Sequence, residues 1–348
     1  MAKKTEASDN LPLLKAAIRE KNIGRLYIFH GEEVFLLHHY FEQLRKLLVD
    51  PLTESFNFHK LTGETFDMMA FVNAVENLPM MAESTMVWVD DVDIFKMNEA
   101  DSEKLTDVLS DIPDYCTVVF TYETVQWKAD KRMKKLWDAI NDNGIVVDFV
   151  KQSQRDLIAW VTRHFAAEHK QISQELCAYL IDITGGTMTA LAGEISKIAA
   201  FSGADVIVKA DIDAVTEPVL DAAVFQMTNM ISDGKYGSAL EKLHQLLKMQ
   251  EDPLLILGAI GGHFRRMATA RTLLDNGRNA SDLMRLYNLG DYAARKTMSA
   301  AGKFSADFYK KTAELLLETD HQMKTSYDTQ ERLLEILILR IAQEARNG

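Results

Sequence analysis

Short apolar runs alternate with helical patterns through the first 150 residues. Residues 26–29 are all apolar and lead to Gly31, and residues 34–48 then place apolar side chains at alternating steps of three and four. Three further largely apolar runs lie at 86–89, 117–120 and 144–149. Runs of this kind suit strands that are covered on both faces. Residues 1–150 are therefore predicted to form an α/β domain with a parallel sheet.

Beyond residue 150 the strand pattern disappears and apolar residues recur at helical spacing. The segment from Thr184 to Gly186 is typical of a helix stop followed by a restart. We therefore expect residues 151–218 to form a small helical domain. Pro218 falls in the next break, and the pattern after it is again helical. The remaining residues, 219–348, are predicted to form a larger helical domain.

The composition is that of an ordinary globular protein, with 47% hydrophobic and 26% charged residues. The formal net charge is −12, which argues against a surface that tracks a nucleic-acid backbone along its whole length. One local basic patch is still compatible with it. The two cysteines, Cys116 and Cys177, are far apart and have no CxxC spacing, so neither a disulfide framework nor a zinc site is indicated.

The chain carries no pattern typical of export or of a membrane span. The first ten residues have no apolar core after their lysines. The richest apolar run, residues 333–341, is interrupted by Glu335 and Arg340. We expect an intracellular protein located in the cytoplasm, with no membrane partner.

One apolar run ends in two carboxylates, Asp90 and Asp91, as does the strand that holds Mg²⁺ beside a nucleotide in many hydrolases. Such proteins also carry a phosphate loop, G-x-x-x-x-G-K-[ST], after their first strand. The corresponding junction here begins at Gly31, has only that glycine, and lacks the lysine and the hydroxyl residue. The sequence therefore indicates half of a nucleotide site.

Two acidic residues make the same junction unfavourable for phosphate. Glu32 and Glu33 place negative charge where the dipole of the next helix would otherwise favour an anion. Like charges about 4 Å apart repel by roughly 4 kcal/mol in a partly screened environment. We therefore expect no bound nucleotide or other cofactor, and we interpret Asp90 and Asp91 mainly as solvated carboxylates at a strand end.

No other catalytic pattern is apparent. The adjacent histidines His38 and His39 face different sides of a helix, and there is no H-E-x-x-H sequence, so no metal site is predicted. There is no G-x-S-x-G elbow either. We expect no catalytic residues in this chain.

The strongest basic segment is WKADKRMKKLW. Its spacing predicts that Lys128, Lys131, Arg132 and Lys135 lie along one helical face. A solvated helix face is the simpler interpretation, and a patch that contacts phosphate or acidic groups is the alternative.

Two adjacent methionines stand just ahead of the strand that ends in the two carboxylates. Pro79 disfavours a helical conformation at Leu78, so a helix end or turn is expected there. Met80 and Met81 then occupy a short connection at the edge of the α/β domain. They are either core residues or, if exposed, an adaptable apolar contact for a partner.

Several segments, taken in order, resemble one protein family. They are LYIFHGEEVFLLHHYFEQL, ENLPMMAESTMVWVDD, VVFTYETVQWKADKRMKKLWDAI and ITGGTMTALAGEISKIAAF, followed by the helical remainder. In order and spacing these segments look like the delta subunits of the bacterial DNA polymerase III clamp loader. The resemblance covers nearly the whole chain.

The resemblance implies a fold and a set of partners. It implies an AAA+-like α/β domain with a degenerate nucleotide site in residues 1–150, a helical lid in 151–218 and a helical collar in 219–348 that joins a ring of loader subunits. The implied partners are the sliding clamp (beta), the tau/gamma-type ATPase subunits, delta-prime, and primed DNA within the assembled complex. ATP hydrolysis would belong to the partner subunits of a DNA-directed DNA polymerase holoenzyme.

The resemblance also assigns residues. In the family a small apolar pair ahead of the carboxylate-bearing strand inserts into the clamp, and by position this pair is Met80 and Met81, flanked by Leu78 and Pro79. Many relatives carry Leu-Phe or Phe-Phe at this place, so the methionine pair departs from the commoner pattern. The degenerate nucleotide site corresponds to Gly31, Glu32, Glu33, Asp90 and Asp91.

Two other functions remain open at the level of the sequence. One is an active ATPase with an unorthodox site, in which Asp90 and Asp91 hold Mg²⁺. The other is a helical adaptor that binds DNA directly through its basic segment. ATP binding by the isolated chain tests the first, and salt-dependent duplex binding tests the second.

Overall fold

The computed structural model describes residues 10–130 and 132–347, without the side chains of Ser232 and Asn347. Two predictions concern residues outside this described part. One places Lys131 in the basic segment, and the other expects no export signal in residues 1–9. The chain divides into two compact units, Met1–Gln152 and Ser153–Gly348. Each unit is described separately below.

The first unit contains a five-stranded parallel sheet, as predicted from the apolar runs. Its strands are β1 (Leu26–His30), β2 (Phe58–Thr62), β3 (Thr85–Asp90), β4 (Cys116–Tyr122) and β5 (Gly144–Asp148). The order across the sheet is β2-β3-β4-β1-β5. Every residue of β4 is buried, whereas β2, at the edge, is only partly covered. The apolar pattern thus revealed the three central strands, β1, β3 and β4, and the edge strand β5, but not the edge strand β2.

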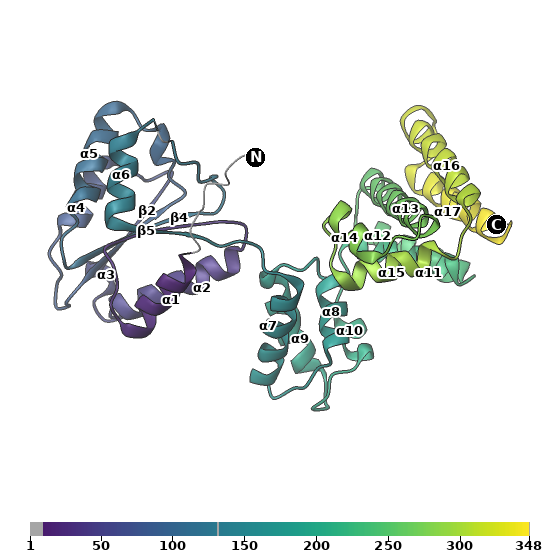
Figure 1. Ribbon diagram of the computed structural model, residues 1–348, viewed down its shortest axis with the longest axis horizontal. Coiled ribbons are helices and arrows are strands. Elements are labelled where there is room, and N and C mark those ends of the chain that lie inside the picture. The colour runs from purple at the N-terminus through teal and green to yellow at the C-terminus, as the bar shows by residue number, and fades with distance from the viewer. Residues whose placement is uncertain (1–9, 131, 348) are drawn as a thin grey trace. The chain divides into compact units, whose positions relative to one another are not determined.

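Helices cover both faces of this sheet (Figure 1). They are α1 (Leu11–Glu20), α2 (Val34–Leu48), α3 (Glu54–Asn57), α4 (Met68–Glu76), α5 (Glu99–Ser110) and α6 (Lys134–Asn143), with a 3-10 turn, η1, at Ile94–Lys96. The apolar sides of α1 and α2 form one core with the sheet, and those of α4, α5 and α6 form a second core on the opposite face. This three-layer arrangement leaves the strand ends and their connections at the surface.

The second unit is helical throughout, again as predicted. Its first helices are α7 (Gln154–Ala167), α8 (Gln174–Ile183), α9 (Met188–Phe201) and α10 (Lys209–Val215). The later ones are α11 (Leu220–Ser232), α12 (Tyr236–Lys248), α13 (Pro253–Asp275), α14 (Ala280–Tyr287), α15 (Asp291–Ala301), α16 (Ala306–Thr325) and α17 (Gln330–Asn347).

Glycines end α8 as the sequence suggested, because Gly185 and Gly186 both have left-handed backbone angles, with φ of 76° and 72°. Thr187 then caps α9 by accepting a hydrogen bond from the backbone of Ala190. Helices α11 to α17 contribute to one shared apolar core. The boundary near residue 218, between a lid and a collar, stays a prediction, since the two units divide only at residue 152.

Within residues 10–130 and 132–347 no single helix has the length and apolar composition to cross a membrane. Helices α8 and α9 meet those criteria only as a pair, bent by 119°. Ile181, Leu191 and Ile195 of this pair are buried in the helical unit.

Candidate functional site

An apolar loop, residues 77–84, connects α4 to β3. Leu78 is 72% exposed, Met80 55% and Met81 93%, whereas Pro79 is partly covered. The connection is short, as the sequence predicted, and three large apolar side chains protrude from it. Exposed apolar side chains that gather in one loop are typical of a protein contact site. We call residues 77–84 the apolar loop.

The middle of the apolar loop is held by a buried asparagine. Asn57, at the end of α3, has no exposed surface. Its side-chain oxygen accepts a hydrogen bond from the Met80 N–H at 2.8 Å, and its Nδ2 donates to the Met80 carbonyl at 2.9 Å. The same Nδ2 also donates to the Thr53 carbonyl at 3.2 Å. The amide thus satisfies both backbone groups of Met80.

Both ends of the apolar loop are also tied to the sheet and its helices. Tyr115 donates its hydroxyl proton to the carbonyl of Glu76, the last residue of α4, at 3.0 Å. At the other end the Ser84 hydroxyl donates to the Leu48 carbonyl at 2.8 Å. The loop is therefore fixed at its start, middle and end, while its apolar side chains stay in solvent.

Met81 has a left-handed backbone, with φ of 54°. This region is unfavourable for residues other than glycine, asparagine and aspartate, and it is least accessible to β-branched residues. Methionine is unbranched at Cβ and is therefore a tolerable occupant. The turn at Met81 directly follows the residue that Asn57 holds, and it leaves the Met81 side chain almost wholly exposed.

The junction between β1 and α2 is closed by contrast. Gly31 has φ of 128°, and a Cβ there would lie 2.5 Å from the Phe149 carbonyl oxygen. The Glu33 N–H donates to the same carbonyl at 2.8 Å, and the Phe149 N–H donates to the His30 carbonyl at 2.7 Å. The backbone amides of Glu33 and Phe149, near where a phosphate loop would cradle its anion, are thus bonded within the protein.

The two glutamates of this junction differ in exposure. Glu33 is buried, which departs from the expectation that both carboxylates face an incoming phosphate, because Glu33 precedes α2 where the chain packs against the segment after β5. Glu32 is exposed, and its carboxylate lies 3.6 Å from the ammonium of Lys151. The expected repulsion of phosphate therefore rests on Glu32.

Asp90, at the end of β3, already has partners. It accepts a hydrogen bond from the Thr121 hydroxyl at 2.8 Å and lies 3.6 Å from the Lys60 ammonium. The Thr121 hydroxyl oxygen in turn accepts from the Trp88 indole N–H at 2.7 Å. This chain of bonds makes Asp90 part of the contact between β3 and β4.

Asp91 organises the segment that follows β4. It accepts hydrogen bonds from the backbone N–H groups of Glu123 at 2.8 Å, Thr124 at 3.1 Å and Val125 at 3.1 Å, and from the Thr124 hydroxyl at 2.7 Å. Partial burial raises its pKa, but these hydrogen bonds together bring the pKa of Asp91 below its ordinary value. Its carboxylate is therefore a structural acceptor for that segment.

Aromatic rings cover the carboxyl ends of β1 and β4. Trp127 stacks on His30 with ring centroids 5.9 Å apart, and it also contacts Tyr122 at 4.9 Å and Phe95 at 5.3 Å. Burial lowers the pKa of His30, against a smaller opposing effect of the nearby Asp148. In open α/β sheets ligands bind outside the carboxyl ends of the strands. Here apolar rings occupy that position.

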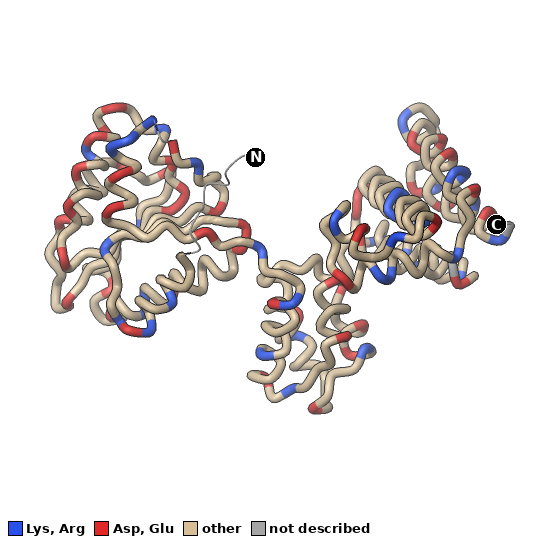
Figure 2. Tube along the Cα trace, viewed as in Figure 1, with Lys and Arg blue, Asp and Glu red and all other residues tan. Residues whose placement is uncertain are grey.

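The prediction that the basic segment forms one helical face is wrong. Helix α6 begins only at Lys134, so Lys128 and Arg132 precede it and Lys135 alone lies within it. The reason is a local turn, in which Arg132 donates to the Asp130 carboxylate at 2.7 Å and lowers the pKa of Asp130 to about 2. Figure 2 shows basic and acidic residues interleaved along the chain. A contact patch for phosphate or acidic groups stays a prediction.

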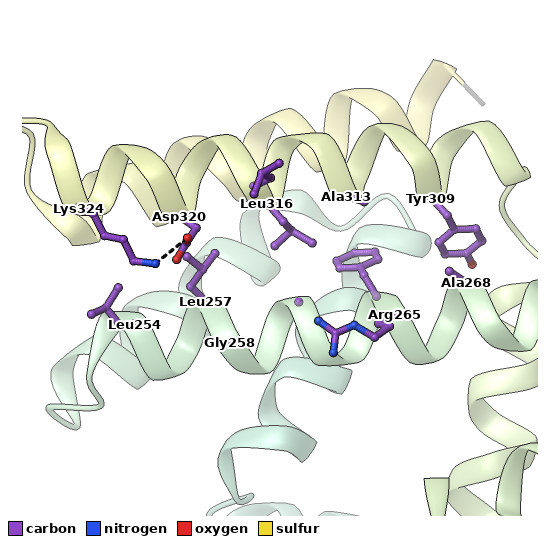
Figure 3. A pocket seen from close by; sticks show the side chains of 13 residues that line it. Leu254, Leu257, Gly258, Arg265, Ala268, Tyr309, Ala313, Leu316, Asp320 and Lys324 are labelled. Atoms are coloured by element: carbon purple, nitrogen blue, oxygen red, sulfur yellow. Dashed lines mark hydrogen bonds and ion pairs between the residues drawn. The ribbon is translucent and has the colours of Figure 1, made fainter. Parts of the chain in front are cut away.

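The helical unit has a groove between α13 and α16, with a volume of about 630 Å³ (Figure 3). Leu254, Leu257 and Phe264 line it from α13, and Leu316 and Leu317 from α16. Its polar members include the ion pair between Lys324 and Asp320, 2.7 Å apart, at one end of the groove.

Among the described residues no cluster of three or more histidine, cysteine or carboxylate side chains has the arrangement of a metal site.

Two family models match the chain. The model described as "DNA polymerase III, delta subunit" matches residues 27–150, and the model for the C-terminal domain of the same delta subunit matches residues 221–341. Together they match well over half of the sequence. The chain belongs to the DNA polymerase III delta subunit family.

Individual relatives agree with this delta assignment. The chain is 23% identical over 331 residues to DNA polymerase III subunit delta of Bacillus subtilis, in a match that covers 93% of this chain and 95% of that protein. It is 21% identical over 269 residues to the probable delta subunit of Aquifex aeolicus, with 75% and 74% covered. The match in both cases extends across the α/β and the helical units.

The delta fold is also found in a solved structure. The Bacillus subtilis DNA clamp loader delta protein superimposes with a TM-score of 0.57 at 20% sequence identity, covering 96% of this chain and 99% of that one. The fold is therefore that of this clamp loader delta protein, an α/β unit followed by helices.

Proposed function

We propose that this delta-family chain binds the ring-shaped sliding clamp through the apolar loop and helps to open it for loading onto primed DNA. Met80 and Met81 form the contact, and Leu78 and Pro79 flank it. The observation that carries the proposal is the exposure of three large apolar side chains on a loop that is itself fixed.

The methionine pair contributes a substantial part of the binding free energy in this proposal. Burying a methionine side chain contributes about 1.5 to 3 kcal/mol, so the pair contributes roughly 3 to 6 kcal/mol. Their unbranched thioethers adapt to the shape of an apolar pocket. Because both side chains are exposed in the free protein, most of this apolar area is available for burial in a partner.

Opening the clamp requires more than tight binding. A ligand shifts a conformational equilibrium only by its differential affinity for the two states. We propose that the apolar loop fits the clamp better when the ring interface is opened or distorted than when it is closed. This chain then stabilises the open ring, and release follows when the loader withdraws the loop.

ATP binding and hydrolysis belong, in this proposal, to tau/gamma-type ATPase subunits. The closed β1–α2 junction, the internal partners of Asp90 and Asp91, and the aromatic rings over the strand ends all support a chain that binds no nucleotide. The helical region after residue 218 joins the chain to these ATPase subunits and to delta-prime. The apolar groove between α13 and α16 supports such packing, since it exposes leucines on both helices.

The decisive experiment measures binding of the purified full chain to a sliding clamp. Replacing Met80 and Met81 together by alanine is expected to weaken binding by about two orders of magnitude, from the loss of roughly 3 kcal/mol of apolar burial. Met249→Ala is the matched control, because Met249 is 49% exposed and lies in the helical unit. Unchanged affinity in the double variant would overturn the site.

A further inference from the structure

The hydrogen bonds of Asn57 differ from those of an ordinary buried polar residue. Its bond to Thr53 is local and satisfies one donor of the side chain. The other two bonds both reach Met80, 23 residues further along the chain, and pair with that residue's N–H and its C=O. Two bonds to one residue fix the direction of its peptide groups as well as its position.

No other side-chain type makes this set of contacts in the same space. The site requires one acceptor facing the Met80 N–H and donors facing two carbonyls, and a planar primary amide has an oxygen and two N–H groups in that arrangement. Aspartate has no donor when ionised, and leucine has neither donor nor acceptor. Because Asn57 is completely buried, solvent does not compete for these bonds in the intact protein.

We propose that Asn57 is the positioning residue of the apolar loop: it holds Met80 so that the chain turns at Met81 and both methionines are presented before the clamp arrives. This inference rests on the proposed clamp binding for its functional part. The left-handed backbone of Met81 is the conformation that the anchor maintains. Without the anchor the loop samples other conformations, and the apparent affinity falls in proportion to the fraction of molecules that remain in the presented one.

The first test concerns the loop alone and needs no clamp. Asn57→Ala and the near-isosteric Asn57→Leu are compared with the wild-type chain by amide hydrogen exchange, read in peptides that cover residues 77–84. We expect exchange in this segment to accelerate about tenfold or more, since a net hydrogen bond contributes about 1 kcal/mol and two are removed. Exchange in the strands β1 and β4 should change little.

Thr121→Val is the matched control for a general loss of stability. Thr121 is also buried in the first unit and also makes two side-chain hydrogen bonds, to Trp88 and Asp90, but it has no bond to the apolar loop. If exchange in residues 77–84 rises no more in either Asn57 variant than in Thr121→Val, the positioning role is overturned. The variants are compared at equal distance below their own melting temperatures.

The second test measures clamp association and dissociation. Asn57→Ala, with both methionines intact, is expected to bind the clamp about tenfold more weakly, and the loss should appear largely in the association rate, because fewer molecules present the loop. In a chain that already carries Met80→Ala and Met81→Ala, the Asn57 substitution should add nothing. Faster exchange with unchanged clamp binding would also overturn the inference.

The outcomes separate this inference from the proposed function. If the methionine double variant binds the clamp as well as the wild-type chain does, the proposed contact fails, while the exchange measurement still decides whether Asn57 positions the loop. If the methionine variant loses binding and the Asn57 variants keep it, the contact stands and the positioning role fails.

Discussion

Two connections of the same α/β unit have opposite surfaces. The β1–α2 junction places Gly31 against the segment after β5, and the Glu33 N–H and the His30 carbonyl are both bonded to Phe149. The apolar loop between α4 and β3 also bonds its backbone internally, through Asn57, yet it leaves its apolar side chains in solvent. The comparison shows what suits a surface to a partner: its backbone groups already have hydrogen-bond partners, and its apolar side chains are still exposed and available for burial.

The largest expected effect comes from a charge placed in the apolar loop. Met81→Asp should abolish measurable clamp binding, because an unpaired carboxylate would be transferred into an apolar contact. The melting temperature should stay within a degree or so, since Met81 is 93% exposed and makes little contact in the free chain. Titration of the clamp with the full chain and a thermal melt provide both readings.

Met249→Asp is the control, because it introduces the same charge at an exposed methionine of the helical unit. This variant should bind the clamp as the wild-type chain does. Retained binding by Met81→Asp would mean that the apolar loop is not the contact. Equal loss in the two variants would point to a nonspecific effect of charge.

The next largest effect is on the stability of the closed β1–α2 junction. Gly31→Ala should lower the free energy of unfolding by about 3 kcal/mol, because the backbone conformation excludes a side chain and the new Cβ would overlap the Phe149 backbone. Chemical denaturation of the full chain, followed by a probe in the α/β unit, measures it. Molecules that remain folded should bind the clamp normally.

Gly193→Ala serves as the control for this glycine, because a Cβ at that helical position meets nothing within 4 Å. It should leave the chain as stable as before, or more stable by about 0.5 kcal/mol. A harmless Gly31→Ala would show that the junction has room to open, and the contrast between the two connections would disappear.

A smaller effect comes from the carboxylate of Asp91. Its pKa is lowered in the folded chain, so its ionised form contributes stability above the ordinary aspartate pKa, and that contribution is lost as the pH falls through the lower folded-state pKa. Asp91→Asn should therefore cost about 1 kcal/mol at neutral pH, from weaker hydrogen bonds to residues 123–125. The cost should shrink below about pH 4.

Unfolding free energies of the wild-type and Asp91→Asn chains across this pH range measure the difference. If the loss of unfolding free energy caused by Asp91→Asn became larger as the pH falls, the pH trend would be opposite to the expected one. That result would contradict the role of Asp91 as an ionised acceptor. Asp142→Asn, on the exposed C-terminal turn of α6, is a suitable comparison in the same unit.

The smallest expected effect is that of nucleotide. Saturating Mg²⁺ and ATP should leave the melting temperature of the isolated chain unchanged, because a ligand that does not bind the folded state does not stabilise it. A rise that disappears in Asp90→Ala would support the alternative of an unorthodox ATPase. It would also show that the closed junction opens for nucleotide.

The sequence was informative where the spacing of apolar residues alone identifies a helix or a strand. The apolar runs predicted the central strands β1, β3 and β4, which are covered on both faces, and also the edge strand β5, because its residues 145–147 are all apolar. They did not reveal β2, residues 58–62, at the other sheet edge, because the polar residues at 59, 60 and 62 interrupt its apolar pattern. The helices after residue 150 followed from spacing alone.

Contacts between distant segments could not be predicted. Pro79 placed the apolar loop correctly, but nothing near Asn57 indicates that its amide reaches Met80, because the pairing depends on how α3 and the loop meet in space. The cover that Trp127 provides over His30 is of the same kind. The basic segment was predicted as helix because its spacing fits one, and the Asp130–Arg132 turn overrides that spacing.

The position of β1 within the sheet has a consequence during synthesis. β1 is made early, yet both of its neighbours, β4 and β5, lie towards the end of the α/β unit. Bacterial ribosomes add about 5 to 20 residues per second, so the nascent β1 waits several seconds or more for its partners. During that interval the apolar side chains of β1 and the methionines of the apolar loop are exposed together. Exposed apolar surface of this kind is prone to aggregation, so the nascent chain is most vulnerable until residue 148 has emerged.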